Sequence, residues 1–259
     1  SQTARVELVL PLDAPPRRTP IVVHLAASGE TTFFARRQLA RFLLRHGIAS
    51  LILENPYYGS RRPAKQQAAA LRTVSDQFAM NFATVEEGRA LLRYLHREGF
   101  ERIAVTGFSQ GGVMAAFCAA LSDFPVAVAA RGAANSVADL FTRDNFSQIV
   151  LWERLAQETG DEPSARRYFR AALEVVTVSH FPPPACPEAA VILAGRHDRF
   201  VDPAQARALS EHWPGSELRW LEAGHVTALA NVSSHIDSIR TALSRLRVGG
   251  EDGIVRRIG

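Results

Sequence analysis

Lysine is almost absent from this chain of 259 residues: Lys65 is the only one, and the other basic residues are arginine. The formal net charge is +4, and the arginines are spread along the whole sequence. A nucleic-acid-binding surface needs a clustered basic patch or a recognition motif, and the sequence has neither. We therefore expect no nucleic-acid partner.

Cysteine is also scarce, with Cys118 and Cys186 as the only two. Two thiols do not make the disulfide framework of a small secreted domain, and no group of cysteines and histidines has metal-ligand spacing. We therefore expect a reducing environment, no bound metal and no organic cofactor.

Long hydrophobic runs are missing as well. No stretch reaches the roughly 18 apolar residues that a transmembrane helix needs, so we expect no membrane-spanning segment. Residues 1–7 lack the basic segment and apolar core of a secretory signal. We expect a cytoplasmic protein, although the chain does not begin with Met and a removed signal is compatible with it.

The most specific motif is G-x-S-x-G at residues 107–111, between a short apolar run and an alanine-rich helical pattern. In a nucleophile elbow the serine occupies a sharp strand-to-helix turn, so the residues two positions away on either side must be small. Gly107 and Gly111 meet that need, and Gly112 lets the helix pack closely on the sheet. The motif predicts an α/β-hydrolase fold with Ser109 as its nucleophile.

Apolar runs typical of buried strands alternate with helical patterns along the rest of the chain. The predicted strands are 6–12, 21–26, 48–53, 102–106, 126–130, 190–194 and 217–221. The predicted helices are 31–46, 85–98, 110–121, 203–212 and 225–246. This alternation predicts an α/β fold with a mostly parallel sheet of about seven or eight strands and helices on both faces.

Residues 135–184 break the alternation, because they carry helical patterns without a convincing strand. Insertions at this point of the fold commonly form a lid, so we predict a small helical cap between two core segments, 1–134 and 185–247. A second insertion is expected at 61–82. We expect a flexible tail at 248–259.

A serine attacks only when a base takes its proton, and the base needs an acid to hold its tautomer. In α/β-hydrolases the three groups follow the chain in the order serine, acid, histidine. Asp198 and His225 each follow a predicted strand, at the sheet edge where functional groups gather. Asp202 is the alternative acid, but it precedes a proline and is a natural helix N-cap. We predict Ser109, Asp198 and His225 as the catalytic triad.

The transition state also needs hydrogen-bond donors for its oxyanion. One is the backbone N–H of Gln110, and the other comes from the loop after the strand at 21–26. By its position Ala26 is the donor, with Ala27 as the neighbouring alternative. We interpret His24 as a residue that orients this loop.

Residues 49–63, ASLILENPYYGSRRP, resemble a signature of the alpha/beta-hydrolase-domain-containing protein 18 family. Segments 24–29, 74–78, 107–112 and 213–225 are similar to that family too, so the resemblance covers most of the chain. It implies a serine hydrolase with the triad given above and no defined natural substrate. The chain departs from larger relatives by a short proline-rich loop in place of a long insertion, and by glutamine at 110 where methionine is common.

Residues 54–63 follow a buried strand and therefore belong to the same sheet edge as the elbow. In one interpretation Tyr57 and Tyr58 form a wall of the substrate pocket, and Arg61 with Arg62 binds an anionic group of the substrate. In the other, the proline and glycine of the segment shape a turn, the tyrosines pack, and the arginines face water.

These residues together predict hydrolysis of a small-molecule carboxylic ester through an acyl-Ser109 intermediate. The aromatic residues of the cap favour a hydrophobic acyl group, although they also serve as the cap's own core. A thioesterase or an acyltransferase would use the same triad. A ligand-binding scaffold without catalysis is the alternative of another class, but all three triad positions are filled. The sequence does not indicate whether the chain is a monomer or an oligomer.

Overall fold

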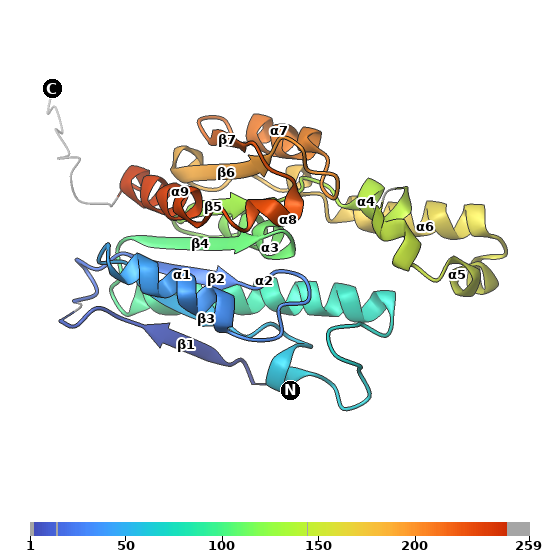
Figure 1. Ribbon diagram of the computed structural model, residues 1–259, viewed down its shortest axis with the longest axis horizontal. Coiled ribbons are helices and arrows are strands. Elements are labelled where there is room, and N and C mark those ends of the chain that lie inside the picture. The colour runs from blue at the N-terminus through green and yellow to red at the C-terminus, as the bar shows by residue number, and fades with distance from the viewer. Residues whose placement is uncertain (1–2, 14, 144, 248–259) are drawn as a thin grey trace, which may run out of the picture.

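The computed structural model describes residues 3–13, 15–143 and 145–247 (Figure 1). The tail predicted to be flexible, 248–259, lies outside them. Within the described residues, no helix is long and apolar enough to cross a bilayer.

One sheet of seven strands lies at the centre of the described chain, in the order β1-β3-β2-β4-β5-β6-β7. The strands are β1 (Val6–Val9), β2 (Ile21–Leu25), β3 (Ala49–Leu53), β4 (Ile103–Phe108), β5 (Ala127–Arg131), β6 (Ala190–Gly195) and β7 (Glu217–Leu221). Only the edge strand β1 runs antiparallel to its neighbour. Strands β2, β3, β5 and β6 are buried along their whole length, which explains their mostly apolar sequences. The predicted mostly parallel sheet is confirmed.

Helices cover both faces of the sheet (Figure 1). Helices α1 (Phe34–Leu44) and α9 (Val232–Arg245) pack on one face, through a core that includes Leu43 and Ile239. Helices α2 (Val74–Arg97), α3 (Gln110–Ala120) and α7 (Pro203–His212) cover the other face. The parallel strands end at the right-hand side of the view.

Two helices differ from their prediction. Helix α2 begins at Val74, where the Thr73 hydroxyl accepts a hydrogen bond from the N–H of Asp76 and caps the helix. The predicted insertion 61–82 is therefore partly helical. The predicted helix 225–246 is interrupted, since α8 (His225–Ala228) ends in turns before α9 begins.

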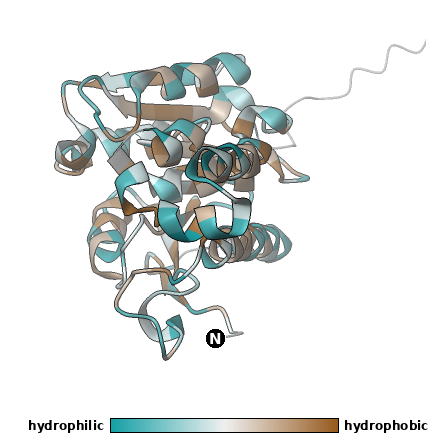
Figure 2. Cartoon of the chain, turned by 90° about the vertical axis from the view of Figure 1, so that its right-hand side faces the viewer, coloured by the Kyte–Doolittle hydropathy of each residue, from teal (hydrophilic) through white to brown (hydrophobic). Residues whose placement is uncertain are grey.

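The predicted cap contains α4 (Ala138–Thr142), α5 (Trp152–Thr159) and α6 (Glu162–Val175). These helices extend from the side of the sheet where the parallel strands end (Figure 1). Figure 2 views the molecule from that side and shows hydrophobic and hydrophilic residues alternating along the nearest helices, as expected for amphipathic helices. The base of the predicted cap is tied to the core by a hydrogen bond from the N–H of Ser136 to the side chain of Gln205 in α7.

Candidate active site

Ser109 lies in the turn between β4 and α3 with φ 54° and ψ −119°, a backbone conformation that residues with a side chain rarely adopt. The flanking glycines allow this turn for a steric reason. A Cβ atom on Gly107 would lie 2.3 Å from the carbonyl carbon of Gly111, and one on Gly111 would lie 2.5 Å from the carbonyl oxygen of Leu25. The motif therefore forms the sharp elbow that its spacing predicts.

The structure brings the three predicted triad residues together. The Nε2 atom of His225 lies 2.9 Å from the Oγ atom of Ser109, and its Nδ1 atom lies 2.6 Å from Oδ2 of Asp198. The imidazole and the carboxylate are each more than nine-tenths buried. An imidazole that donates from Nδ1 to the carboxylate can accept the serine proton at Nε2.

The acid is held by the loop that follows β6. The second oxygen of Asp198 accepts hydrogen bonds from the backbone N–H groups of Phe200 and Val201, each at 2.8 Å. These two donors fix the orientation of the carboxylate. Asp202, the alternative acid, instead accepts a hydrogen bond from the N–H of Ala204 and caps α7. The geometry therefore favours Asp198.

Two other histidines lie in the core on the α1–α9 side of the sheet. His24 belongs to β2, and its ring bonds the hydroxyl of Ser50 on β3 rather than the loop that we expected it to orient. Burial lowers the pKa of His24 to about 3. His235 of α9 contacts the hydroxyl of Thr106, and burial likewise lowers its pKa well below the ordinary value. Among the described residues no group of side chains is suited to holding a metal ion.

The loop after β2 lies beside the elbow. A Cβ atom on Gly111 would approach the carbonyl oxygen of Ala26 to 2.7 Å, so the two backbones are in close contact. The N–H of Ala27 is already engaged, because it donates to the carboxylate of Glu30 at 3.1 Å. Gln110 is the first residue of α3, and an N–H at that position has no partner within the helix.

A chain of aromatic rings connects the predicted cap to the imidazole of His225, and the sequence did not predict this chain. The ring of Phe200 lies 5.5 Å from that of His225 and 5.9 Å from that of Phe146. The chain continues into the cap through Phe141, Phe169 and Trp152. Phe108 contacts the imidazole as well, with centroids 4.8 Å apart. Phe200 follows the predicted acid, Asp198, by only two positions, and this proximity was the sequence feature that could have indicated an aromatic ring near the site.

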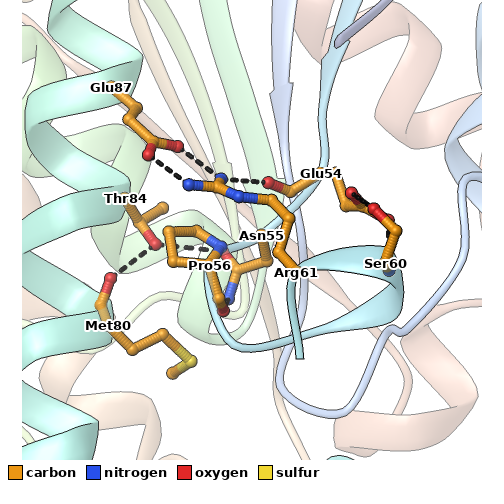
Figure 3. Close-up of polar contacts among 8 residues, drawn as sticks. All are labelled: Glu54, Asn55, Pro56, Ser60, Arg61, Met80, Thr84 and Glu87. Atoms are coloured by element: carbon orange, nitrogen blue, oxygen red, sulfur yellow. Dashed lines mark hydrogen bonds and ion pairs between the residues drawn. The ribbon is translucent and has the colours of Figure 1, made fainter. Parts of the chain in front are cut away.

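Arg61 differs from both interpretations of segment 54–63, since it neither faces water nor is free to bind a substrate anion. This arginine is 3% exposed, and its guanidinium bonds both carboxylate oxygens of Glu87 and the carbonyl oxygen of Glu54 (Figure 3). It is therefore not presented to a substrate anion. Tyr58 is buried, whereas Tyr57 is half-buried and has a positive φ of 66°. Arg62 faces solvent.

Arg131 was not singled out by the sequence. It ends β5, is 8% exposed, and has no carboxylate within ion-pair distance in the described chain. Its guanidinium carbon lies 5.0 Å from the ring centre of Phe108, and burial lowers its pKa to about 10. Its carbonyl oxygen accepts the N–H of Ser109 at 2.8 Å, so β5 supports the elbow directly.

Solved structures with this fold come from several bacteria. The Thermus thermophilus protein TT1662 shares 17% identity at a TM-score of 0.66, over 92% of this chain and 93% of that one. The esterase Est2 of Thermogutta terrifontis shares 16% identity at 0.59, over 93% and 88%. The proline iminopeptidase of Mycobacterium smegmatis shares 16% identity at 0.58, over 93% and 94%. These similarities establish the α/β-hydrolase fold.

The sequence itself matches the model of the family described as alpha/beta hydrolase domain containing 18. The match covers residues 1–165 and 156–245. It extends over nearly all of the chain and agrees with the resemblance of residues 49–63. The chain therefore belongs to the alpha/beta hydrolase domain containing 18 family.

Proposed function

We propose that the protein is a serine hydrolase that cleaves a carboxylic ester through an acyl-Ser109 intermediate. The observation that carries this proposal is the continuous hydrogen-bonded line from Ser109 through His225 to Asp198. Membership of a hydrolase family and similarity in fold to an esterase and a peptidase support it.

In the acylation step, Ser109 attacks the carbonyl carbon of the ester while its proton moves to Nε2 of His225. Asp198 stabilises the imidazolium that forms. The carbonyl oxygen becomes an oxyanion, for which the N–H groups of Ala26 and Gln110 are the proposed donors. The engagement of Ala27 by Glu30 supports the choice of Ala26. Collapse of the intermediate breaks the ester C–O bond, and the leaving alcohol takes the proton from His225.

Deacylation reverses the roles with water as the nucleophile. His225 takes a proton from the water as it attacks the acyl carbon, and a second oxyanion forms at the same donors. Its collapse releases the carboxylic acid and returns the proton to Ser109. No residue needs a net change of charge over the whole cycle.

The substrate that we propose has a hydrophobic acyl group. Phe108 and Phe200 flank the imidazole, and the aromatic chain leads from there into the cap. Such surfaces bind apolar groups without specific hydrogen bonds. Tyr57, half-buried after β3, stays a candidate for the wall of the pocket.

The first experiment is labelling with a fluorophosphonate, read by intact mass, with wild type beside Ser109→Ala. We expect one adduct on the wild type and none on the variant, because only an activated serine reacts with such a probe. Ser122→Ala is the matched control and should keep the adduct. An unlabelled wild type that is folded would contradict the proposal and favour a scaffold without catalysis.

A further inference from the structure

The residues that follow β3 hold the loop after β2 in place. Tyr58 is 2% exposed, and its hydroxyl accepts a hydrogen bond from the N–H of Gly29 at 3.1 Å. A Cβ atom on Gly59 would lie 2.8 Å from the carbonyl oxygen of Thr31, so the two backbones touch there as well. The segment with the family signature thus packs against the loop that carries Ala26.

This segment is in turn fixed to α2 (Figure 3). The guanidinium of Arg61 joins the carboxylate of Glu87 to the backbone of Glu54. The hydroxyl of Thr84 donates to the side-chain oxygen of Asn55 at 3.0 Å. Both contacts are buried or partly buried, so little water competes for these groups.

The same helix contacts the elbow. The side-chain oxygen of Asn81 accepts a hydrogen bond from Nε2 of Gln110 at 2.7 Å and another from Gln77 at 3.0 Å. Gln77, Asn81 and Thr84 are spaced four and three residues apart, so they share one face of the helix. One polar face of α2 therefore contacts the elbow directly and the loop after β2 through the signature segment.

We propose that Tyr58 and Asn81 are positioning residues, which orient the two oxyanion donors. Tyr58 holds the loop that carries the N–H of Ala26, and Asn81 holds the elbow that carries the N–H of Gln110. Helix α2 is the shared support of both. This inference rests on the proposed function. Donors of an oxyanion hole act because they are already oriented when the charge develops. A loop that drifts by a fraction of an ångström weakens that interaction and leaves substrate binding intact.

The positioning role of Tyr58 and Asn81 predicts a specific change in kcat and KM. An oxyanion exists in the transition state and not in the bound ester, so a displaced donor lowers kcat and leaves KM nearly unchanged. A tyrosine that binds the substrate would do the opposite, because its loss would raise KM. The two roles are thus separable in one experiment.

The test compares Tyr58→Phe and Asn81→Leu with the wild type on p-nitrophenyl butyrate. Tyr58→Phe loses one hydrogen bond and Asn81→Leu loses two, while each keeps the bulk of the side chain. We therefore expect kcat to fall about 3- to 10-fold with KM within twofold. Butylboronic acid, which forms a tetrahedral adduct on serine, should lose affinity by the same factor. Tyr94→Phe, on an exposed part of α2, should match the wild type.

Hydrogen exchange gives a readout that does not depend on turnover. Amides of residues 26–30 should exchange faster in Tyr58→Phe than in the wild type, at an unchanged melting temperature. Unchanged exchange, or kcat and boronate affinity equal to the wild type in both variants, would overturn the inference while ester hydrolysis by the wild type still stands. A rise of KM alone would overturn it in favour of substrate contact. A wild type that neither hydrolyses esters nor reacts with the fluorophosphonate would refute the proposed function and, with it, the role of both donors.

Discussion

The ring of Phe200 lies 5.5 Å from the ring of His225, and the backbone N–H of the same residue donates to Asp198. Its ring also contacts Phe146 of the cap. One residue thus touches the candidate base, the candidate acid and the cap. A single side chain therefore links the imidazole to the predicted cap.

Phe200→Leu keeps the backbone bond to Asp198 and removes the ring contacts. Because each aromatic contact is worth about 0.5–1.5 kcal/mol, we expect kcat/KM to fall roughly tenfold for long acyl chains and less for acetate. The measurement is a series of p-nitrophenyl esters from acetate to octanoate. Phe42→Leu, at the far end of α1, is the control. Equal chain-length profiles for the two variants would rule out this role of Phe200.

Asp198→Asn should lower kcat by on the order of 10⁴, because the amide no longer holds the imidazole in the correct tautomer. Asp202→Asn should keep nearly full turnover, since an asparagine caps α7 about as well as an aspartate. Steady-state kinetics of both variants on one ester decides whether Asp198 or Asp202 is the acid. The reverse order of effects would assign the acid to Asp202.

Glu87→Ala should destabilise the fold by about 3–5 kcal/mol, because it leaves the buried guanidinium of Arg61 without its counter-ion. Glu86→Ala is the matched control on the neighbouring position. Its carboxylate is 64% exposed and pairs with Arg89, so its loss should cost less than about 1 kcal/mol. Urea unfolding measures both, and equal costs would refute the structural role of the Arg61–Glu87 pair.

Stability should fall on acidification because His24 is buried in its neutral form. Its folded pKa is lowered to about 3, whereas the unfolded chain binds a proton below about 6.5. The unfolded state therefore takes up the proton first, and the free energy of unfolding falls between these two values by about 1.4 kcal/mol per pH unit for this group. His24→Asn should remove that share of the slope in urea unfolding at pH 7, 6, 5 and 4. A slope equal to that of the wild type would show that His24 does not contribute.

The sequence was sufficient for the parts of the fold that follow from periodicity and local sterics. All seven strands of the described sheet overlap the predicted ones, and the elbow forms because Gly107 and Gly111 leave room for it. The order of Ser109, Asp198 and His225 along the chain was enough to select residues that the structure brings within hydrogen-bond distance.

Contacts between segments that are distant in the sequence do not follow from periodicity or local sterics. Arg61 was expected to be accessible because its partner, Glu87, lies 26 residues away. No local sequence pattern indicates that Glu87 contacts the loop after β3. The start of α2 was missed because its first turns mix polar and apolar residues: Met80 is buried in the core, whereas Asn81 bonds the side chain of Gln110 in the elbow. His24 was expected to orient the loop after β2, but its partner, Ser50, belongs to β3, which lies far from it in the sequence.

Ser109 has a further consequence through its backbone, which takes the φ and ψ angles that glycine adopts without strain. Ser109→Gly should therefore melt at a higher temperature than the wild type while having no turnover. Ser109→Ala keeps the strain and should not gain stability. A lineage released from the need for turnover would gain robustness by drifting toward glycine at this position. Under the proposed function, the serine is kept at this position at the expense of stability.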